Sequence, residues 1–177
     1  MGIKNKKLAF IDIETTGLLL NKHEIIELGC VLARQNTFEI IEEFDIKIKP
    51  ERIEDADEIG LKVNGYNEKD WENALPLKQA MEIFAGKTNG AIMVAHNISF
   101  DSAFLERAFE ITGIENKMHY QKLDTVSIAF AKLYKNKKVE RFSLSALCEY
   151  FNIENKKAHT ALSDARATYE LYKHLMI

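Results

Sequence analysis

The chain has 177 residues, of which 46% are hydrophobic, with a formal net charge of −3 and a pI near 6.0. This length and apolar content predict one globular domain, residues 1–177, with a full hydrophobic core. The slightly acidic balance excludes nucleic-acid binding through a basic field over the whole surface, so any phosphate contact must be local or assisted by a metal.

The early part of the chain reads as three strands. Hydrophobic periodicity predicts them at residues 7–14, 24–33 and 38–49, and Pro50 ends the third. Residues 50–69 are polar with few apolar anchors, and the length of this connection indicates a functional segment.

Strands and helices alternate in the rest of the chain. The expected elements are a helix over Trp71–Ala85, a short strand at Ala91–Ala95, a helix with Ser99 as N-cap that runs to Thr112 and closes at Gly113, a helix after Lys122–Thr125 that runs through Tyr134, a short helix capped by Ser143 that runs through Phe151, and a final helix over His159–Met176. This order predicts an α/β architecture with a mixed sheet and helices on its faces.

Cysteine usage and the N-terminus indicate a cytoplasmic protein. Cys30 and Cys148 stand in apolar runs outside any C-x-x-C pair, which predicts buried free thiols in a reducing compartment. The basic start, residues 1–7, has no following apolar stretch long enough for a signal peptide or a membrane span. We therefore expect no membrane association.

Two acids at the end of the first strand are the most informative feature. Asp12 and Glu14 stand two residues apart, so the period of a strand directs both carboxylates to the same face. The surrounding run is too apolar for the alternative, an edge strand with two solvated acids. Buried like charges are costly unless a positive charge lies between them, and a hard divalent cation fits that role. We therefore predict a metal site here.

A second group of polar residues, 96–101, lies where a short strand gives way to a helix. Asp101 falls in the first turn of that helix, a position where the helix dipole alone also favours a carboxylate. His96 at the strand end is assigned a structural, half-buried role, because His159 is better placed for chemistry.

His159 and Asp164 stand near the start of the final helix. Five helical positions rotate by about 140°, so the two side chains share a site only if His159 lies on the loop or first turn. Small residues at 161, 165 and 167 indicate close packing of Asp164 against the sheet. The alternative is a helix-start histidine beside an exposed acid.

Three blocks together resemble the DEDDh family of 3′–5′ exonucleases, which includes proofreading subunits of DNA polymerases, ribonuclease T and oligoribonuclease. The blocks are Asp12-Ile13-Glu14-Thr15-Thr16-Gly17, His96-Asn97-x-x-Phe100-Asp101 and His159-x-Ala161-x-x-Asp164-Ala165. They span nearly the whole chain in the family's order. The resemblance implies a ribonuclease H-like fold with a five-stranded mixed sheet flanked by helices.

The resemblance also implies a reaction that uses two divalent ions, Mg²⁺ or Mn²⁺. Asp12 would bridge both ions, and Glu14 and Asp164 would hold the ion that activates water. Asp101 would support the second ion, and His159 would act as the general base. Four carboxylates and two cations would let an acidic protein bind a polyanion.

The expected substrate is a single-stranded nucleic-acid 3′ end, cut to nucleoside 5′-monophosphates. By resemblance Leu18 would wedge between the last two bases and Phe100 would contact the terminal nucleotide, with core packing as the alternative for both. Thr15, Thr16 and Gly17 would add backbone or hydroxyl contacts. A further expected substrate contact is Asn97, whose alternative role is to tie down its loop.

The sequence does not assign a single role to two regions. The basic run over residues 135–141 is either a solvated loop or a track for the phosphodiester backbone. Many relatives carry a histidine before glycine in the long connection, whereas this chain has Asn64-Gly65, which puts substrate contacts there in question.

The expected substrate is DNA, in proofreading or repair, and the expected partner is a DNA polymerase or replication protein. The alternatives are an exoribonuclease or oligoribonuclease-like enzyme, an endonuclease on the same fold, and a nucleic-acid-binding module without turnover. The sequence leaves the oligomeric state open.

Overall fold

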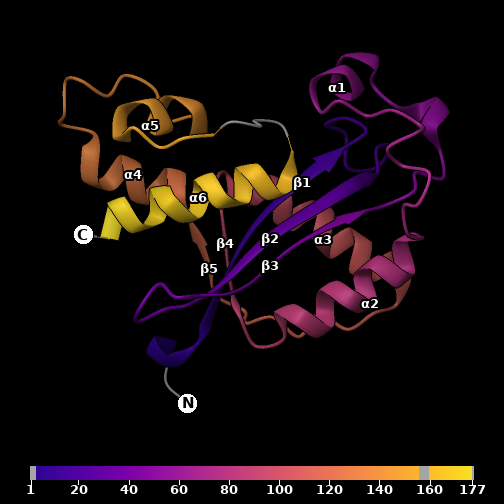
Figure 1. Cartoon of the computed structure of the whole chain (residues 1–177), viewed down its shortest axis with the longest axis horizontal. Coiled ribbons are helices and arrows are strands. Elements are labelled where there is room, and N and C mark those ends of the chain that lie inside the picture. Colours follow the sequence, from indigo (N-terminus) through magenta and orange to yellow (C-terminus); the bar gives the residue numbers. More distant parts are fainter. Residues whose placement is uncertain (1–2, 156–159, 177) are drawn as a thin grey trace.

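The computed structural model describes residues 3–155 and 160–176 (Figure 1). Its elements in chain order are a 3-10 turn at Ile3–Asn5, β1 (Lys7–Thr15), β2 (Ile25–Arg34), β3 (Ile40–Lys47), a 3-10 turn at Ile53–Asp55, α1 (Glu58–Val63), α2 (Leu77–Thr88), β4 (Ile92–Ala95), α3 (Ile98–Thr112), β5 (Lys122–Asp124), α4 (Thr125–Leu133), α5 (Leu144–Phe151) and α6 (Ala161–Met176).

The strands form one mixed sheet in the order β3-β2-β1-β4-β5. β2 pairs antiparallel with both β1 and β3, so the first three strands form a meander. β4 runs parallel to β1, and β5 runs parallel to β4. The expected five-stranded mixed α/β sheet is therefore confirmed, with β1 at its centre. The carboxyl ends of β1, β4 and β5 lie at the same end of the sheet, where α3 and α4 begin.

Helices cover both faces of the sheet (Figure 1). Side chains of α2 and α3 pack on one face against alternate β1 residues such as Ile11 and Ile13. On the other face α6 packs against Leu8 and Phe10, and the Phe10 and Tyr169 rings meet edge to face with centroids 5.2 Å apart. Such a pair adds about 0.5–1.5 kcal/mol beyond area burial. The same alternation directs Asp12 and Glu14 to the α6 face.

The helix expected over Trp71–Ala85 begins later than the sequence indicates. α2 starts at Leu77, directly after Pro76, whose fixed φ and missing amide donor suit the residue before a helix. Trp71 lies outside the helix, is buried, and donates its indole N–H to the Ile26 carbonyl at 2.9 Å. Its apolar side chain therefore belongs to a contact with the sheet rather than to a helix face.

One further expectation, the N-cap of α3, is wrong. Ser99 is not the N-cap of α3, because the helix begins at Ile98 after Asn97, which adopts a left-handed conformation with φ 67°. The connection over residues 50–69 contains α1, which is capped by the Asp57 side chain. The expected C-terminal glycine of α3, Gly113, is confirmed with φ 66°.

Both cysteines are free and buried, as predicted. Within residues 3–155 and 160–176, no helix combines the length and the apolar character that crossing a bilayer requires.

Candidate active site

Three carboxylates from opposite ends of the chain meet at the end of β1. Asp12 and Glu14 project from β1, and Asp164 lies in the first turn of α6. One oxygen of each lies within 4.8 Å of the others. Closely spaced carboxylate oxygens are the donor set that a hard divalent cation prefers. The fold therefore gathers the first, second and last acids of the sequence motifs into one group.

Asp101 lies next to this group, in the first turn of α3, and is 4% exposed. Its oxygens are not within the 4.8 Å group, but after burial its charge contributes most to the raised pKa of Asp12. Burial raises the pKa of Asp101 itself to about 7, against hydrogen bonds from its own backbone and that of Ile13. All four predicted acids are therefore neighbours, with Asp101 slightly apart.

The cluster is electrostatically unfavourable without a counter-ion. Burial, followed by the charges of Asp101, Asp164 and Glu14, raises the pKa of Asp12 well above its ordinary value. Burial and the Asp164 charge raise the pKa of Glu14 to about 8. Like charges held together in a poorly solvated site bind protons or cations readily. This property, together with the oxygen donor set, fits a divalent metal.

The loop after β1 is held by its own hydrogen bonds. The Thr15 hydroxyl donates to the Gly17 carbonyl at 2.7 Å, and the Thr16 hydroxyl accepts from the Glu24 amide at 2.9 Å. Gly17 has φ 152°, and a Cβ there would overlap the His23 ring. The Thr15 and Thr16 hydroxyls thus shape the loop, and their substrate contacts stay a prediction.

The two expected base-contacting residues differ in exposure. Leu18 is 76% exposed, which excludes the core-packing alternative for this side chain. Phe100 is partly buried, and its ring lies 4.9 Å from that of Phe104. Phe100 therefore packs against the core and is partly exposed, and substrate contact by either residue stays a prediction.

Asn97 and His96 are both engaged in local contacts. The Asn97 backbone N–H donates to Asp124 at 3.0 Å, and the Asn97 side-chain oxygen accepts from the Ser99 hydroxyl at 3.1 Å. Substrate contact by Asn97 stays a prediction. The two His96 ring nitrogens lie 2.9 Å from the Thr125 hydroxyl and 2.9 Å from the Phe142 carbonyl. This pairing suits the structural role that the sequence assigned to His96.

His159 lies outside the described residues, so its predicted role as general base stays a prediction. The residues that flank it are informative. The Asn155 side chain donates to Asp164 at 2.5 Å and accepts from the Ser163 hydroxyl at 2.7 Å. Asn155 therefore holds the first turn of α6 from the preceding loop. The sequence carried no periodic signal for this contact.

Two more residues beside the acidic cluster were missed by the sequence reasoning. Glu27 on β2 is 3% exposed and accepts from the Ala161 amide at 3.1 Å. Glu27 is the one charged residue in the apolar run of residues 25–32, and this pattern could have indicated a buried polar role. Asn64, in the long connection, donates from its side chain to the Thr15 carbonyl at 2.9 Å.

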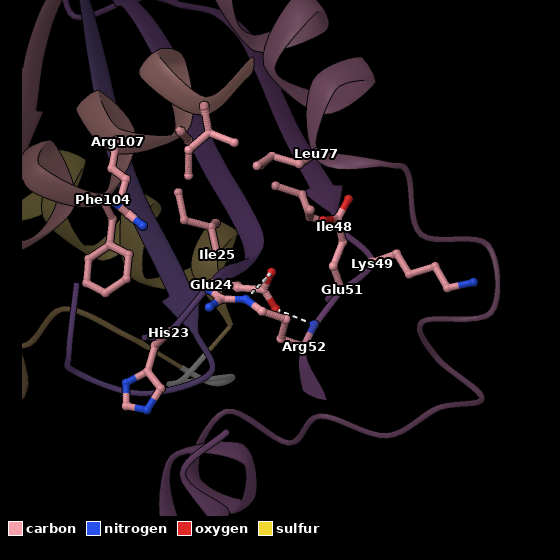
Figure 2. Close-up of a pocket in the computed structure, with 12 residues that line it drawn as sticks. His23, Glu24, Ile25, Ile48, Lys49, Glu51, Arg52, Leu77, Phe104 and Arg107 are labelled. Atoms are coloured by element: carbon pink, nitrogen blue, oxygen red, sulfur yellow. Dashed lines mark hydrogen bonds and ion pairs between the residues drawn. The ribbon is translucent and has the colours of Figure 1, made fainter. Parts of the chain in front are cut away.

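A separate hollow of about 220 Å³ lies on the α2/α3 face of the sheet (Figure 2). Ile25, Ile48 and Phe104 form its apolar wall, and Arg52 ion-pairs with Glu24 at its rim. None of the four clustered acids lines it. The chemistry of the carboxylates therefore belongs to the α6 face.

Comparison with known proteins supports one family. The sequence model of the RNase_T family, described as an exonuclease, matches residues 9–172. The chain is 29% identical over 172 residues to the PolC-type DNA polymerase III of Thermotoga petrophila, covering 97% of this chain and 12% of that protein. It is 33% identical over 168 residues to the PolC-type DNA polymerase III of Listeria welshimeri, covering 95% and 11%. The chain thus spans about a ninth of the length of these relatives.

Solved structures share the fold. Escherichia coli exonuclease I in complex with a dT13 oligonucleotide superposes with a TM-score of 0.81 at 16% identity, covering 96% of this chain and 41% of that one. A 3′-exonuclease that recognises a histone mRNA stem-loop superposes with a TM-score of 0.75 at 15% identity, covering 99% and 66%. The family match over nearly the whole chain, the ribonuclease H-like sheet and the motif order agree, and the chain belongs to the DEDDh-type 3′–5′ exonuclease family.

Proposed function

We propose that this chain is a metal-dependent 3′–5′ exonuclease that shortens single-stranded DNA and releases nucleoside 5′-monophosphates. The observation that carries the proposal is the meeting of the Asp12, Glu14 and Asp164 carboxylates within 4.8 Å. Acids from both ends of the chain converge there at a cost in like-charge repulsion. Such unfavourable repulsion between buried carboxylates is typical of functional sites.

The donor set fits divalent cations, and Asp12, Glu14 and Asp164 would hold them. Asp101, buried beside Asp12, would support a second ion. When bound, Mg²⁺ or Mn²⁺ would lower the pKa of a water molecule and offset the charge that develops on the phosphate. The carboxylates alone would repel a phosphodiester, so the phosphate would approach where the cations that they hold reverse the local field.

Other residues would handle the proton and the bases. His159, in the family's motif position, would accept the proton of the attacking water. The exposed Leu18 would contact the last bases, and Phe100 would border the terminal nucleotide. Apolar contact tolerates any base, so little sequence preference is expected. Thr15, Thr16, Gly17 and Asn97 would add contacts around them.

DNA is favoured over RNA because the relatives with 29–33% identity are DNA polymerases. Exonuclease I, a structural neighbour, binds dT13 and dA16 oligonucleotides. The same relatives make a DNA polymerase or replication protein a candidate partner in the cytoplasm. RNA remains the alternative substrate, since one neighbour recognises histone mRNA.

The test uses 5′-labelled DNA and RNA oligonucleotides of matched sequence, short and long, with Mg²⁺, with Mn²⁺ and with EDTA. We expect a ladder of products shortened from the 3′ end on DNA, lost in EDTA. Faster RNA degradation would assign the chain as an exoribonuclease. Cleavage of a circular single strand would indicate an endonuclease, and binding without shortening would indicate a module without turnover.

A further inference from the structure

The strand beside the acidic cluster carries two residues that directly face its ligands. In the β1–β2 pairing, Asp12 is opposite Gly29, and Glu14 is opposite Glu27. Residues opposite each other in an antiparallel pair direct their side chains to the same face. Gly29 and Glu27 therefore lie on the α6 face, under the start of α6.

Gly29 lets the backbone of α6 touch the sheet. A Cβ built at Gly29 would overlap the backbone of Ala161 and Leu162, the first residues of α6. Backbone atoms cannot swing aside as a side chain does, so any larger residue would move the helix start outward.

Glu27 fastens the same turn. Its buried carboxylate accepts the Ala161 amide at 3.1 Å, across a sequence separation of 134 residues. The first amides of a helix have no partner within the helix, so this acceptor caps α6 from the neighbouring strand. The contact holds the start of α6 over β2.

Asp164 follows three residues later in the same turn, where its amide donates to the Thr160 carbonyl at 3.1 Å. We propose that Glu27 and Gly29 are positioning residues that act through the α6 N-terminus to hold Asp164 at ligand distance from Asp12 and Glu14. This inference rests on the proposed metal-dependent function. It says that residues of β2 set the distance between Asp164 and the β1 carboxylates, on which cation affinity depends.

The variants separate positioning from simple stability. Glu27→Gln keeps an oxygen acceptor for the Ala161 amide, Glu27→Leu keeps the volume without an acceptor, and Gly29→Ala adds one methyl group. Glu43→Gln is the matched control, because Glu43 joins Arg166 of the same helix at 2.8 Å, but in an exposed pair. The readouts are Mn²⁺ binding by calorimetry, Mn²⁺ dependence of hydrolysis, melting temperature, and hydrogen exchange of the Ala161 amide.

We expect Glu27→Leu and Gly29→Ala to weaken Mn²⁺ binding by about 10- to 100-fold, the range for residues that orient metal ligands. Exchange of the Ala161 amide should accelerate in Glu27→Leu. Mn²⁺ affinity in Glu27→Gln and in Glu43→Gln should stay within about threefold of wild type. Glu27→Gln keeps an oxygen acceptor for the Ala161 amide, and Glu43→Gln leaves the contact between Glu27 and Ala161 unchanged. The KM for the oligonucleotide should change less than the metal requirement.

Wild-type Mn²⁺ affinity in Glu27→Leu, with only a lower melting temperature, would overturn the inference, as would equal losses in Glu27→Gln and Glu27→Leu. If Gly29→Ala does not fold, the two Glu27 variants still decide. If wild-type protein binds Mn²⁺ but hydrolyses no oligonucleotide, the proposed function fails, while the binding and exchange measurements still test the positioning role.

Discussion

Asn64 and Thr15 are joined by a buried hydrogen bond in which the Asn64 side-chain amide donates to the Thr15 carbonyl at 2.9 Å. The bond ties the long connection to the strand end that carries the acids. A second tie lies beside it, where the Asp57 amide donates to the Thr16 carbonyl at 2.7 Å. In this chain the connection between β3 and α2 is therefore part of the site's framework.

Replacing Asn64 with alanine should leave the Thr15 carbonyl without its partner. We expect the free energy of unfolding to fall by about 1–3 kcal/mol and the KM for single-stranded DNA to rise, because the loop with Leu18 loses its support. Asn67→Ala is the control, since Asn67 bonds only nearby residues at the surface. Urea unfolding and steady-state kinetics measure both effects, and equal behaviour of the two variants would contradict the framework role.

Replacing Asp12 with asparagine should abolish hydrolysis while the protein stays folded. The change removes the negative charge and replaces one of the two carboxylate oxygens with an amide nitrogen, and a loss of about 10³-fold or more is expected. It also removes a carboxylate whose pKa is raised by burial and by its acidic neighbours, so the metal-free variant should melt at the same or a higher temperature. A melting temperature well below that of wild type would attribute the lost activity to unfolding instead.

The stability of the metal-free protein should fall as pH rises. The pKa of Glu14 is raised from 4.5 to about 8, so the folded state holds this proton at pH values where the unfolded state has released it. Stability from this group is complete below about pH 4.5 and is lost as pH rises through about 8. We expect a decline on the order of 1–3 kcal/mol between pH 5 and pH 8.5 in EDTA.

Chemical denaturation at a series of pH values measures this decline. Glu14→Gln is the comparison, because it cannot ionise and should show a shallower slope. Asp12, Asp101 and Glu27 also have raised pKa values, so part of the slope should persist in that variant. Identical slopes in the two proteins would remove Glu14 as a source of the pH dependence.

Replacing His159 with alanine should separate proton transfer from metal binding. A general base contributes typically about 10²–10⁴-fold to a rate, so kcat should fall in that range. The Mn²⁺ concentration for half-maximal activity should stay the same, since no ligand oxygen is removed. A large shift in that concentration would instead give His159 a role in holding the metal.

Replacing Leu18 with alanine should weaken substrate binding without affecting the fold. Leu18 is 76% exposed, so its truncation costs little core packing. Loss of an apolar contact with the last bases should raise KM for single-stranded DNA by about tenfold, equivalent to about 1.4 kcal/mol. Leu19→Ala is the matched control at 63% exposure, and an equal effect in both variants would contradict a specific wedge.

The sequence by itself determined the features that depend on local periodicity. The period of two in β1 directs Asp12 and Glu14 to one face, and Gly113 ends α3, as the local pattern indicates. The order of the three motifs along the chain also indicates the family. These features are set by backbone geometry within a few residues, which the pattern of side chains reports directly.

Only the tertiary structure decided which distant groups touch. Trp71 packs on the sheet rather than on a helix face, and its indole N–H donates to the Ile26 carbonyl, which also accepts the Ile48 amide. Asn64 and Glu27 join the site through partners that are 49 and 134 residues away. No local pattern encodes such bonds, because a buried polar group is stabilised by whichever partner the completed fold brings to it.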